Sequence, residues 1–228
     1  MKSSELIDRL LLCDGEGLSC AMAARSGSGK TVLLTHLIES ASRLDRFKNQ
    51  RFIYASMKQE TNFDAPIVSD MTSLVKALKK NRIVTYYPTD PESYEEDIDE
   101  LIETVFSLAE ENPESGFHLT LDDANVMRGF TNRGEASASV RKLVIAGRSK
   151  GVRSLLVTHR LAMLPRLTNA NLSGMLLLSM NSADADYGNR VLGMDLNSLI
   201  EGLGEYRFAY VDLINESVHG FKPIPIEQ

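Results

Sequence analysis

One short segment of the sequence has the residue types and the spacing of a phosphate-binding loop. Backbone N–H groups in such a loop point inward and form an anion nest, and glycine permits the tight curvature because it tolerates positive φ. A lysine after the second glycine can reach the β- and γ-phosphates of a nucleotide, and the next hydroxyl can bind Mg²⁺. The residues with these features are Ala24, Arg25, Ser26, Gly27, Ser28, Gly29, Lys30, Thr31 and Val32. We predict a Walker A loop that binds ATP and Mg²⁺, the alternative being a glycine-rich surface turn.

A pair of acidic residues follows a second apolar run. Asp122 and Asp123 come directly after residues 117–121, so a strand would deliver a carboxylate that holds Mg²⁺ opposite Thr31, as a Walker B motif does. We expect Asp122 to bind the Mg²⁺, and we expect Asp123 to orient or deprotonate the attacking water. The alternative is an aspartate that caps a turn at the end of a strand.

A third polar cluster, Thr158-His159-Arg160, ends another apolar run. His159 could report hydrolysis of the γ-phosphate, or it could be an ordinary histidine at a strand end. In multimeric ATPases an arginine from a neighbouring subunit stabilises the charge that builds on the γ-phosphate. Arg148, Arg160 and Arg190 are all candidates for this finger, and the sequence does not rank them.

Apolar runs and helical patterns alternate along the chain. We predict strands at 18–24, 51–56, 83–87, 118–121, 154–158 and 175–180, helices at 31–44, 70–80, 91–111, 136–150, 183–192 and 196–203, and a closing hairpin at 206–212 and 217–221. This order implies an α/β fold with a mainly parallel central sheet, helices on both faces and a C-terminal β-hairpin. Ligands of open parallel sheets bind beyond the carboxyl ends of the strands, where all three polar clusters fall.

The 228 residues suit one domain, with an N-terminal helix at 1–16, a nucleotide-binding core at 17–205, and the hairpin and a tail at 206–228. The 43% apolar and 25% charged residues are ordinary for a globular protein. No apolar run approaches the roughly 18 residues of a membrane span, so we expect a protein that is not itself transmembrane. Cys13 and Cys20 match no metal or redox spacing, and reduced cytosolic thiols are the expectation.

The net charge of −6 is distributed unevenly. Residues 90–114 contain eleven acidic residues and no basic one, whereas residues 124–166 contain nine basic residues and a single acid. We interpret the acidic stretch as a solvated helix face. The basic stretch has the same simple explanation, but it follows the second nucleotide motif and so could also contact nucleic acid.

Three segments in sequence order, 147–152, 155–160 and 169–171, resemble the FtsK–HerA superfamily of DNA-pumping ATPases. That family typically has a Gly-Arg helix end, an apolar strand ending in Thr-Gln-Arg, and an Ala-Asn pair before the next strand. The compact size, with residues 83–88 and 116–124, resembles its genome-packaging branch from tailless icosahedral viruses with an internal membrane. This chain departs from the pattern at His159, where the family usually has glutamine, and at Asp123, where many members have glutamate.

The resemblance implies a RecA-like P-loop NTPase that forms a homohexameric ring and drives double-stranded DNA through its centre into a preformed capsid. It implies catalytic roles for Lys30, Asp122, Asp123, Arg148, His159 and Arg160. A central channel needs basic residues that follow phosphates without reading bases, and we assign this to Arg128 and Arg133 in the loop 127–134, which could otherwise be ordinary surface.

The resemblance also implies partners at the capsid vertex or among inner membrane proteins. The implied location is the host cytoplasm during assembly, and the virion vertex is a second possibility. Three alternatives remain: a cellular HerA-type or conjugative DNA pump, a small-molecule kinase, and a nucleotide-gated interaction protein that hydrolyses little ATP.

Overall fold

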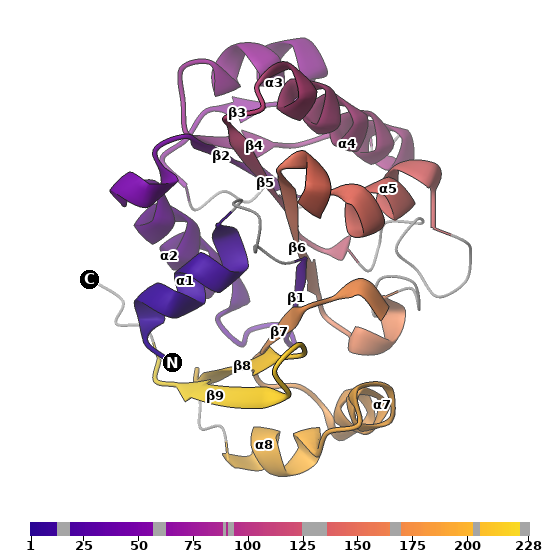
Figure 1. The fold of residues 1–228 in the computed structure, drawn as a ribbon. Helices are drawn as coiled ribbons and strands as arrows, with labels where there is room; N and C mark the ends of the chain where they lie inside the picture. Colours follow the sequence, from indigo (N-terminus) through magenta and orange to yellow (C-terminus); the bar gives the residue numbers. More distant parts are fainter. Residues whose placement is uncertain are drawn as a thin grey trace.

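The computed structural model describes residues 1–12, 19–56, 63–88, 90, 94–124, 136–164, 170–202 and 206–223. These residues form a nine-stranded sheet in the order β3-β4-β2-β5-β6-β1-β7-β8-β9 (Figure 1). The strands are β1 Cys20–Ala23, β2 Gln50–Ala55, β3 Ile67–Val68, β4 Ile83–Tyr86, β5 Gly116–Leu121, β6 Val152–Thr158, β7 Gly174–Leu177, β8 Phe208–Asp212 and β9 Ser217–Phe221. All neighbouring pairs from β3 to β7 are parallel, and β8 and β9 add two antiparallel pairs.

Helices cover both faces of this sheet. They are α1 Ser3–Leu11, α2 Lys30–Ser42, α3 Met71–Leu78, α4 Tyr94–Glu111, α5 Ala138–Ala146, α7 Ser182–Leu192 and α8 Leu196–Gly202, with 3₁₀ turns η1 Asp45–Phe47, η4 Arg148–Lys150 and η5 Leu161–Met163. Helices α1 and α2 pack on one face, and α3, α4, α5, α7 and α8 on the other. The predicted fold class is therefore confirmed.

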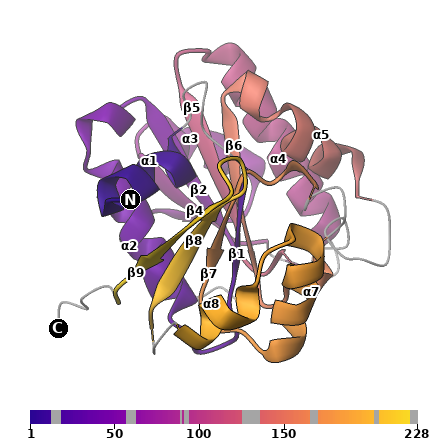
Figure 2. The ribbon, with the colours of Figure 1, turned by 60° about the horizontal axis from the view of Figure 1, so that its bottom comes forward.

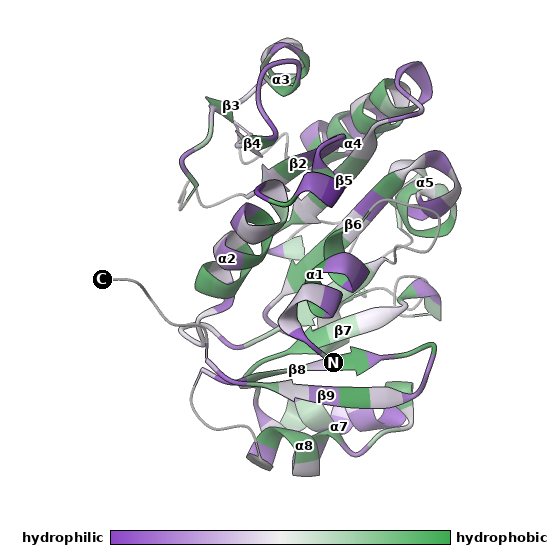
Figure 3. Ribbon diagram, turned by 60° about the vertical axis from the view of Figure 1, so that its left-hand side comes forward, coloured by the Kyte–Doolittle hydropathy of each residue, from purple (hydrophilic) through white to green (hydrophobic). Residues whose placement is uncertain are grey.

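The central strands are apolar on both faces because both faces are buried. In β1, Ala21 and Ala23 belong to the core under α4 and α5, whereas Cys20 and Met22 belong to the core under α1 and α2. Figure 3 shows the resulting hydrophobic runs in the sheet, with hydrophilic residues gathered on the outer helices. This pattern of continuous apolar strands is typical of parallel sheets with two covered faces.

The C-terminal hairpin closes one end of the sheet, where Figure 2 shows it beside α7 and α8. Asp212 at the end of β8 accepts hydrogen bonds from the backbone N–H groups of Ile214 (3.1 Å) and Asn215 (3.0 Å), which forms the turn. The same carboxylate accepts a hydrogen bond from Arg9 of α1. One buried aspartate therefore joins the first helix of the chain to its last strands.

The acidic stretch predicted to be a solvated face is partly paired with the basic stretch that follows it. Glu103 of α4 lies 2.6 Å from Lys142 of α5, and Glu110 of α4 lies 3.3 Å from Lys150 in η4. Two stretches of opposite charge thus meet within the fold, although exposed pairs of this kind contribute only about 0–1 kcal/mol each.

Several elements have bounds that differ from the sequence-based expectation, and two differences matter most. The helix predicted to run from 136 to 150 spans Ala138–Ala146 and is followed by the 3₁₀ turn η4. Gly147 between them has no room for a side chain, since an added Cβ would lie 2.5 Å from the Leu143 carbonyl oxygen. Strand β3 was not predicted, since two residues give no measurable periodicity. Within the described residues, no helix has both the length and the apolar composition of a membrane span.

Candidate nucleotide site

Three adjacent strands bring the polar clusters to one edge of the sheet. Strands β5, β6 and β1 are neighbours, with Leu121 paired to Leu156 and Ala23 paired to Thr158. The phosphate loop, the acidic pair and residues 158–160 each begin where one of these strands ends. The carboxyl edge predicted from the order of the elements is therefore where they meet.

Backbone hydrogen bonds fix the start of the loop from Ala24 to Gly29, and two glycines allow its tight curvature. The Ala24 N–H donates to the Thr158 carbonyl (3.2 Å) and the Arg25 N–H to the Ser179 carbonyl (2.9 Å), so the loop starts between β6 and β7. Gly27 and Gly29 have φ of 77° and 84°, the left-handed region that favours glycine.

Helix α2 begins directly after this loop without a side-chain cap. Its N-cap is Gly29, and no side chain accepts a hydrogen bond from the first turn, which contains Lys30, Thr31 and Val32. The N–H groups of an uncapped first turn and the positive end of the helix dipole favour a bound anion. The geometry suits the phosphate of a nucleotide.

Lys30 lies between the two carboxylates of the acidic pair. Its Nζ is 3.5 Å from Asp122 Oδ1 and 4.0 Å from Asp123 Oδ1, and each of the three side chains is at most 7% exposed. A buried charge is costly unless it is paired, so these contacts hold the lysine beside the loop. The structure thus brings Lys30 together with an acidic pair that begins 92 positions later in the sequence.

Asp122 is held by a tyrosine that sequence reasoning missed. The Tyr54 hydroxyl of β2 donates to Asp122 Oδ2 (2.5 Å), and the Asp123 N–H donates to Asp122 Oδ1 (2.9 Å). Burial, together with the nearby Asp122 carboxylate, raises the pKa of Tyr54, so the hydroxyl remains a donor. An aromatic residue inside a buried strand looks like ordinary core, and the sequence holds no signal that separates the two.

Asp123 and His159 contact one another. His159 Nε2 lies 2.8 Å from Asp123 Oδ1, and the histidine side chain is 26% exposed while the carboxylate is 4% exposed. Asp123 has a φ of 54°, a left-handed conformation that is uncommon outside glycine and is often found at functional sites. The two residues, treated separately in the sequence, form one pair that faces Lys30.

The three candidate arginines occupy different places. Arg160 Nε lies 3.3 Å from Asp184 of α7, so this guanidinium is anchored beside the site. Arg148 lies in η4, before the start of β6, and the seven-residue strand separates it from the site by roughly 20 Å. Arg190 is exposed in the last turn of α7. Arg128 and Arg133, with the loop 127–134, lie outside the described residues.

The side chains at this edge fit a magnesium nucleotide. Two buried carboxylates face one lysine, which leaves an excess of negative charge that suits a cation. The Ser28 Oγ in the loop is buried, and no described residue provides it with a hydrogen-bond partner. No group of three or more His, Cys, Asp and Glu in the described part of the chain could hold a metal alone. Mg²⁺ needs no such group, because it is usually held by one or two carboxylates together with phosphates and water.

Models of protein families and curated protein sequences give no match. Solved structures do: the genome-packaging NTPase B204 of Sulfolobus turreted icosahedral virus 2, in complex with ATP-gammaS, matches with a TM-score of 0.77 at 15% identity. The alignment covers 91% of this chain and 98% of that one. The chain has the fold of this packaging NTPase.

Two further structures extend this comparison. B204 of Sulfolobus turreted icosahedral virus, the DNA-packaging ATPase, matches with a TM-score of 0.73 at 16% identity, over 91% of this chain and 98% of that one. EccC of Thermomonospora curvata (ATPases 2 and 3) matches with a TM-score of 0.60 at 13% identity, over 95% of this chain but 39% of that one. The likeness agrees with the resemblance drawn from the motifs, and at these identities it establishes the fold.

Proposed function

We propose that this protein is an ATP-driven double-stranded DNA translocase that packages a viral genome into a preformed capsid. The observation that carries the proposal is the convergence of Lys30 with Asp122 and Asp123 at the mouth of an uncapped, glycine-bearing loop. Support also comes from the near-complete overlap with a viral packaging NTPase, which leaves few residues of either chain unmatched.

In this proposal each residue at the edge has one chemical task. The loop N–H groups bind the phosphates, and Lys30 leaves the carboxylates to stabilise charge on the β- and γ-phosphates. Asp123 accepts a proton from the attacking water, and His159 orients the Asp123 carboxylate or shares that proton. Tyr54 keeps the Asp122 carboxylate turned toward the loop.

Thr31 and Asp122 would hold the Mg²⁺ that accompanies the nucleotide. When bound, this ion neutralises charge on the β- and γ-phosphates.

The proposed ring explains why Arg148, a candidate arginine finger, lies far from the nucleotide site of its own subunit. Arg148 stands at the opposite end of β6 from the loop, so within a homohexamer it would serve the site of a neighbouring subunit. Arg160, anchored by Asp184 beside the loop, would act within its own subunit. DNA would pass the loop 127–134 and contact Arg128 and Arg133, and the ring would work at a capsid vertex or beside inner membrane proteins in the host cytoplasm.

The decisive experiment measures ATP hydrolysis with and without double-stranded DNA, together with the mass of the assembly. We expect DNA to stimulate hydrolysis and the mass to correspond to six copies. Lys30→Ala should abolish hydrolysis, because the phosphates lose the loop lysine that stabilises their charge and two buried carboxylates lose a cationic partner. Lys142→Ala, which removes a surface lysine of α5, is the matched control.

The results separate the proposal from its competitors. Tight ATP binding with no turnover, in DNA or without it, would favour a nucleotide-gated interaction protein. Full turnover by Lys30→Ala would remove the phosphate loop from the mechanism. Hydrolysis by a monomer that DNA leaves unchanged would exclude the motor and favour a small-molecule enzyme.

A further inference from the structure

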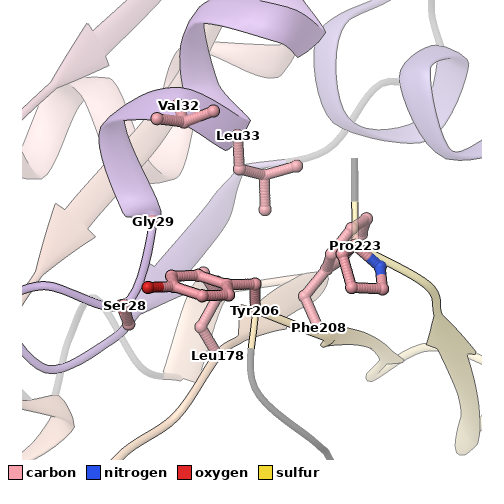
Figure 4. A pocket seen from close by; sticks show the side chains of 8 residues that line it. All are labelled: Ser28, Gly29, Val32, Leu33, Leu178, Tyr206, Phe208 and Pro223. Carbon is pink, nitrogen blue, oxygen red and sulfur yellow. The ribbon is translucent and has the colours of Figure 1, made fainter. Parts of the chain in front are cut away.

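A small apolar pocket adjoins the phosphate loop. Figure 4 shows it between the first turn of α2 and the C-terminal hairpin. Its walls are Val32 and Leu33 on one side, and Leu178, Phe208 and Pro223 on the other. The cavity has a volume of about 150 Å³, and an engineered apolar cavity of about that size in another protein binds benzene. It is large enough for a flat ring.

Tyr206 lies across this pocket in an unusual conformation. Its φ is 57°, a left-handed backbone that is a genuine outlier for an aromatic residue. The ring packs on Gly29, since a Cβ built there would lie 3.3 Å from Tyr206 Cδ1. The residue is nevertheless 56% exposed, so most of its surface remains open to a ligand. A strained and exposed aromatic side chain beside a ligand loop suggests a binding role.

The pocket and the loop share residues. Gly29 lines the pocket and is also the N-cap of α2, and Ser28 lines it within the loop. A molecule that places its phosphates at the loop therefore has a flat, apolar surface next to it. Nucleotides combine these two parts, a charged phosphate chain and an aromatic base.

We infer that this pocket receives the base of the nucleotide, with Tyr206 as the stacking residue, and that it accepts several bases rather than one. This inference rests on the proposed nucleotide site and adds the class of substrate, nucleoside triphosphates in general. Every base has a π-face, so stacking on an aromatic ring tolerates different bases.

The polar groups of the pocket do not distinguish bases. Among the described lining residues, the side-chain polar groups are the hydroxyls of Ser28 and Tyr206. A hydroxyl both donates and accepts, so it can pair with the donor or acceptor edge of any base. Sites that read a substrate by dedicated hydrogen bonds discriminate by about 10⁴–10⁵, whereas apolar pockets discriminate by about 10².

The first test compares kcat/KM for ATP, GTP, CTP and UTP with the wild-type protein and Mg²⁺. We expect the four values to lie within about 10²-fold of one another, with purines ahead because their rings are larger. A preference above that range for one base would overturn the inference of a base-tolerant pocket.

The second test removes the stacking ring. Tyr206→Ala should weaken ADP binding, measured by calorimetry, by about 5- to 150-fold, the range that corresponds to the loss of one stacked base. Tyr206→Phe keeps the ring and loses only the hydroxyl, so it should lose far less ADP affinity than Tyr206→Ala. The inhibition constant of inorganic tripolyphosphate, which has no base, should be unchanged in both variants. Ile214→Ala, an exposed residue in the hairpin turn, is the matched control.

A third variant separates ligand binding from folding. Tyr206→Gly removes both the ring and the backbone strain, since glycine adopts positive φ without a steric clash. We expect thermal stability equal to or above that of the wild type, with ADP affinity as low as in Tyr206→Ala. Unchanged ADP affinity in the Ala and Gly variants would refute the pocket assignment.

The outcomes distinguish this inference from the proposed function. ATP hydrolysis that survives all three Tyr206 substitutions without change refutes the base pocket and leaves the motor standing. ADP binding that depends on Tyr206, in a protein that never hydrolyses ATP, refutes the motor and supports the pocket. Weaker tripolyphosphate inhibition in Tyr206→Ala would mean that the ring supports the loop itself, which also counts against the inference.

Discussion

Asp122 is held by three groups, two of which come from distant parts of the chain. The Tyr54 hydroxyl, the Asp123 N–H and the Lys30 ammonium all reach its two oxygens. Hydrogen bonds to a charged acceptor are about twice as strong as neutral ones. The carboxylate is therefore fixed before any nucleotide arrives, which is the condition for efficient electrostatic catalysis.

This arrangement predicts a positioning role for Tyr54. Tyr54→Phe removes one charge-assisted hydrogen bond, worth about 1.5–3 kcal/mol, and should lower kcat by roughly 10- to 100-fold with little change in the KM for ATP. The Mg²⁺ concentration for half-maximal rate should rise as well, because Asp122, the proposed metal ligand, loses its orientation. Steady-state rates across a Mg²⁺ series provide both readouts.

The control for this substitution is Tyr86→Phe, since Tyr86 is buried in the adjacent strand β4 but belongs to the core on the opposite face of the sheet. An equal loss in both variants would mean that Tyr54 acts through general packing and has no special relation to Asp122.

At the scale of elements, strand β5 has two separate functions. Its carboxyl end delivers Asp122 and Asp123, and its middle carries His118, whose ring is fully buried. His118 Nε2 lies 3.2 Å from the Leu10 carbonyl of α1 and donates to it. Burial lowers the pKa of His118 to about 4, because desolvation disfavours the charged ring. The ring is therefore neutral in the folded protein near pH 7, because burial outweighs the Leu10 hydrogen bond, which by itself favours the charged form.

This pKa predicts acid sensitivity. An unfolded histidine titrates near pH 6.5, so between pH 6.5 and 4 the unfolded chain binds a proton that the folded chain does not. The contribution of His118 to the free energy of unfolding is fully present above pH 6.5 and declines as the pH falls. Between pH 7 and 5 this contribution falls by about 2 kcal/mol. Urea unfolding at the two pH values measures the loss.

His118→Gln keeps a donor for Leu10 without a titrating ring, so its stability should depend less on pH in this range. His36→Gln on the exposed face of α2 should retain the wild-type dependence. If the free energy of unfolding changed with pH equally in all three proteins, the acid sensitivity would not come from His118.

The order of the elements was predictable from the sequence because buried parallel strands and amphipathic helices have distinct periodicities. The prediction of 51–56, for example, differs from β2 by a single residue at each end. The end of α5 at Ala146 was not predictable from periodicity, because the 3₁₀ turn Arg148–Lys150 that follows it has a repeat close to that of an α-helix.

The site was predictable in its parts and not in its contacts. The loop and the acidic pair have local motifs, so their residues could be named. The contact between His159 and Asp123 depends on the adjacency of β5 and β6 and on their register, which no local pattern contains. Tyr54 and Tyr206 give the same sequence signal as any aromatic residue in or beside a strand.

At the scale of the whole molecule, Arg148 and the phosphate loop lie at opposite edges of the sheet. In a ring of identical subunits, one edge of each copy can face the other edge of the next. This arrangement predicts that Arg148→Ala lowers kcat by about 10³-fold or more, the range measured for arginine fingers, without weakening ATP binding.

Mixing tests whether the arginine acts between subunits. Arg148→Ala mixed with Asp122→Asn should recover part of the wild-type rate, because some interfaces pair an intact site with an intact arginine. Lys150→Ala, in the same 3₁₀ turn but paired with Glu110 on the surface, should keep full activity. A mixture no more active than its components would exclude a shared site at Arg148.

The C-terminal hairpin closes the sheet and also supplies one wall of the pocket beside the loop. The loop lies near the start of the printed sequence and this wall near its end. During synthesis on the ribosome, the loop emerges long before the hairpin does. The anchors of the loop at Thr158 and Ser179 are also translated before β8 and β9. We therefore expect ATP to reach its full stabilising effect only once β8 and β9 have been translated and paired.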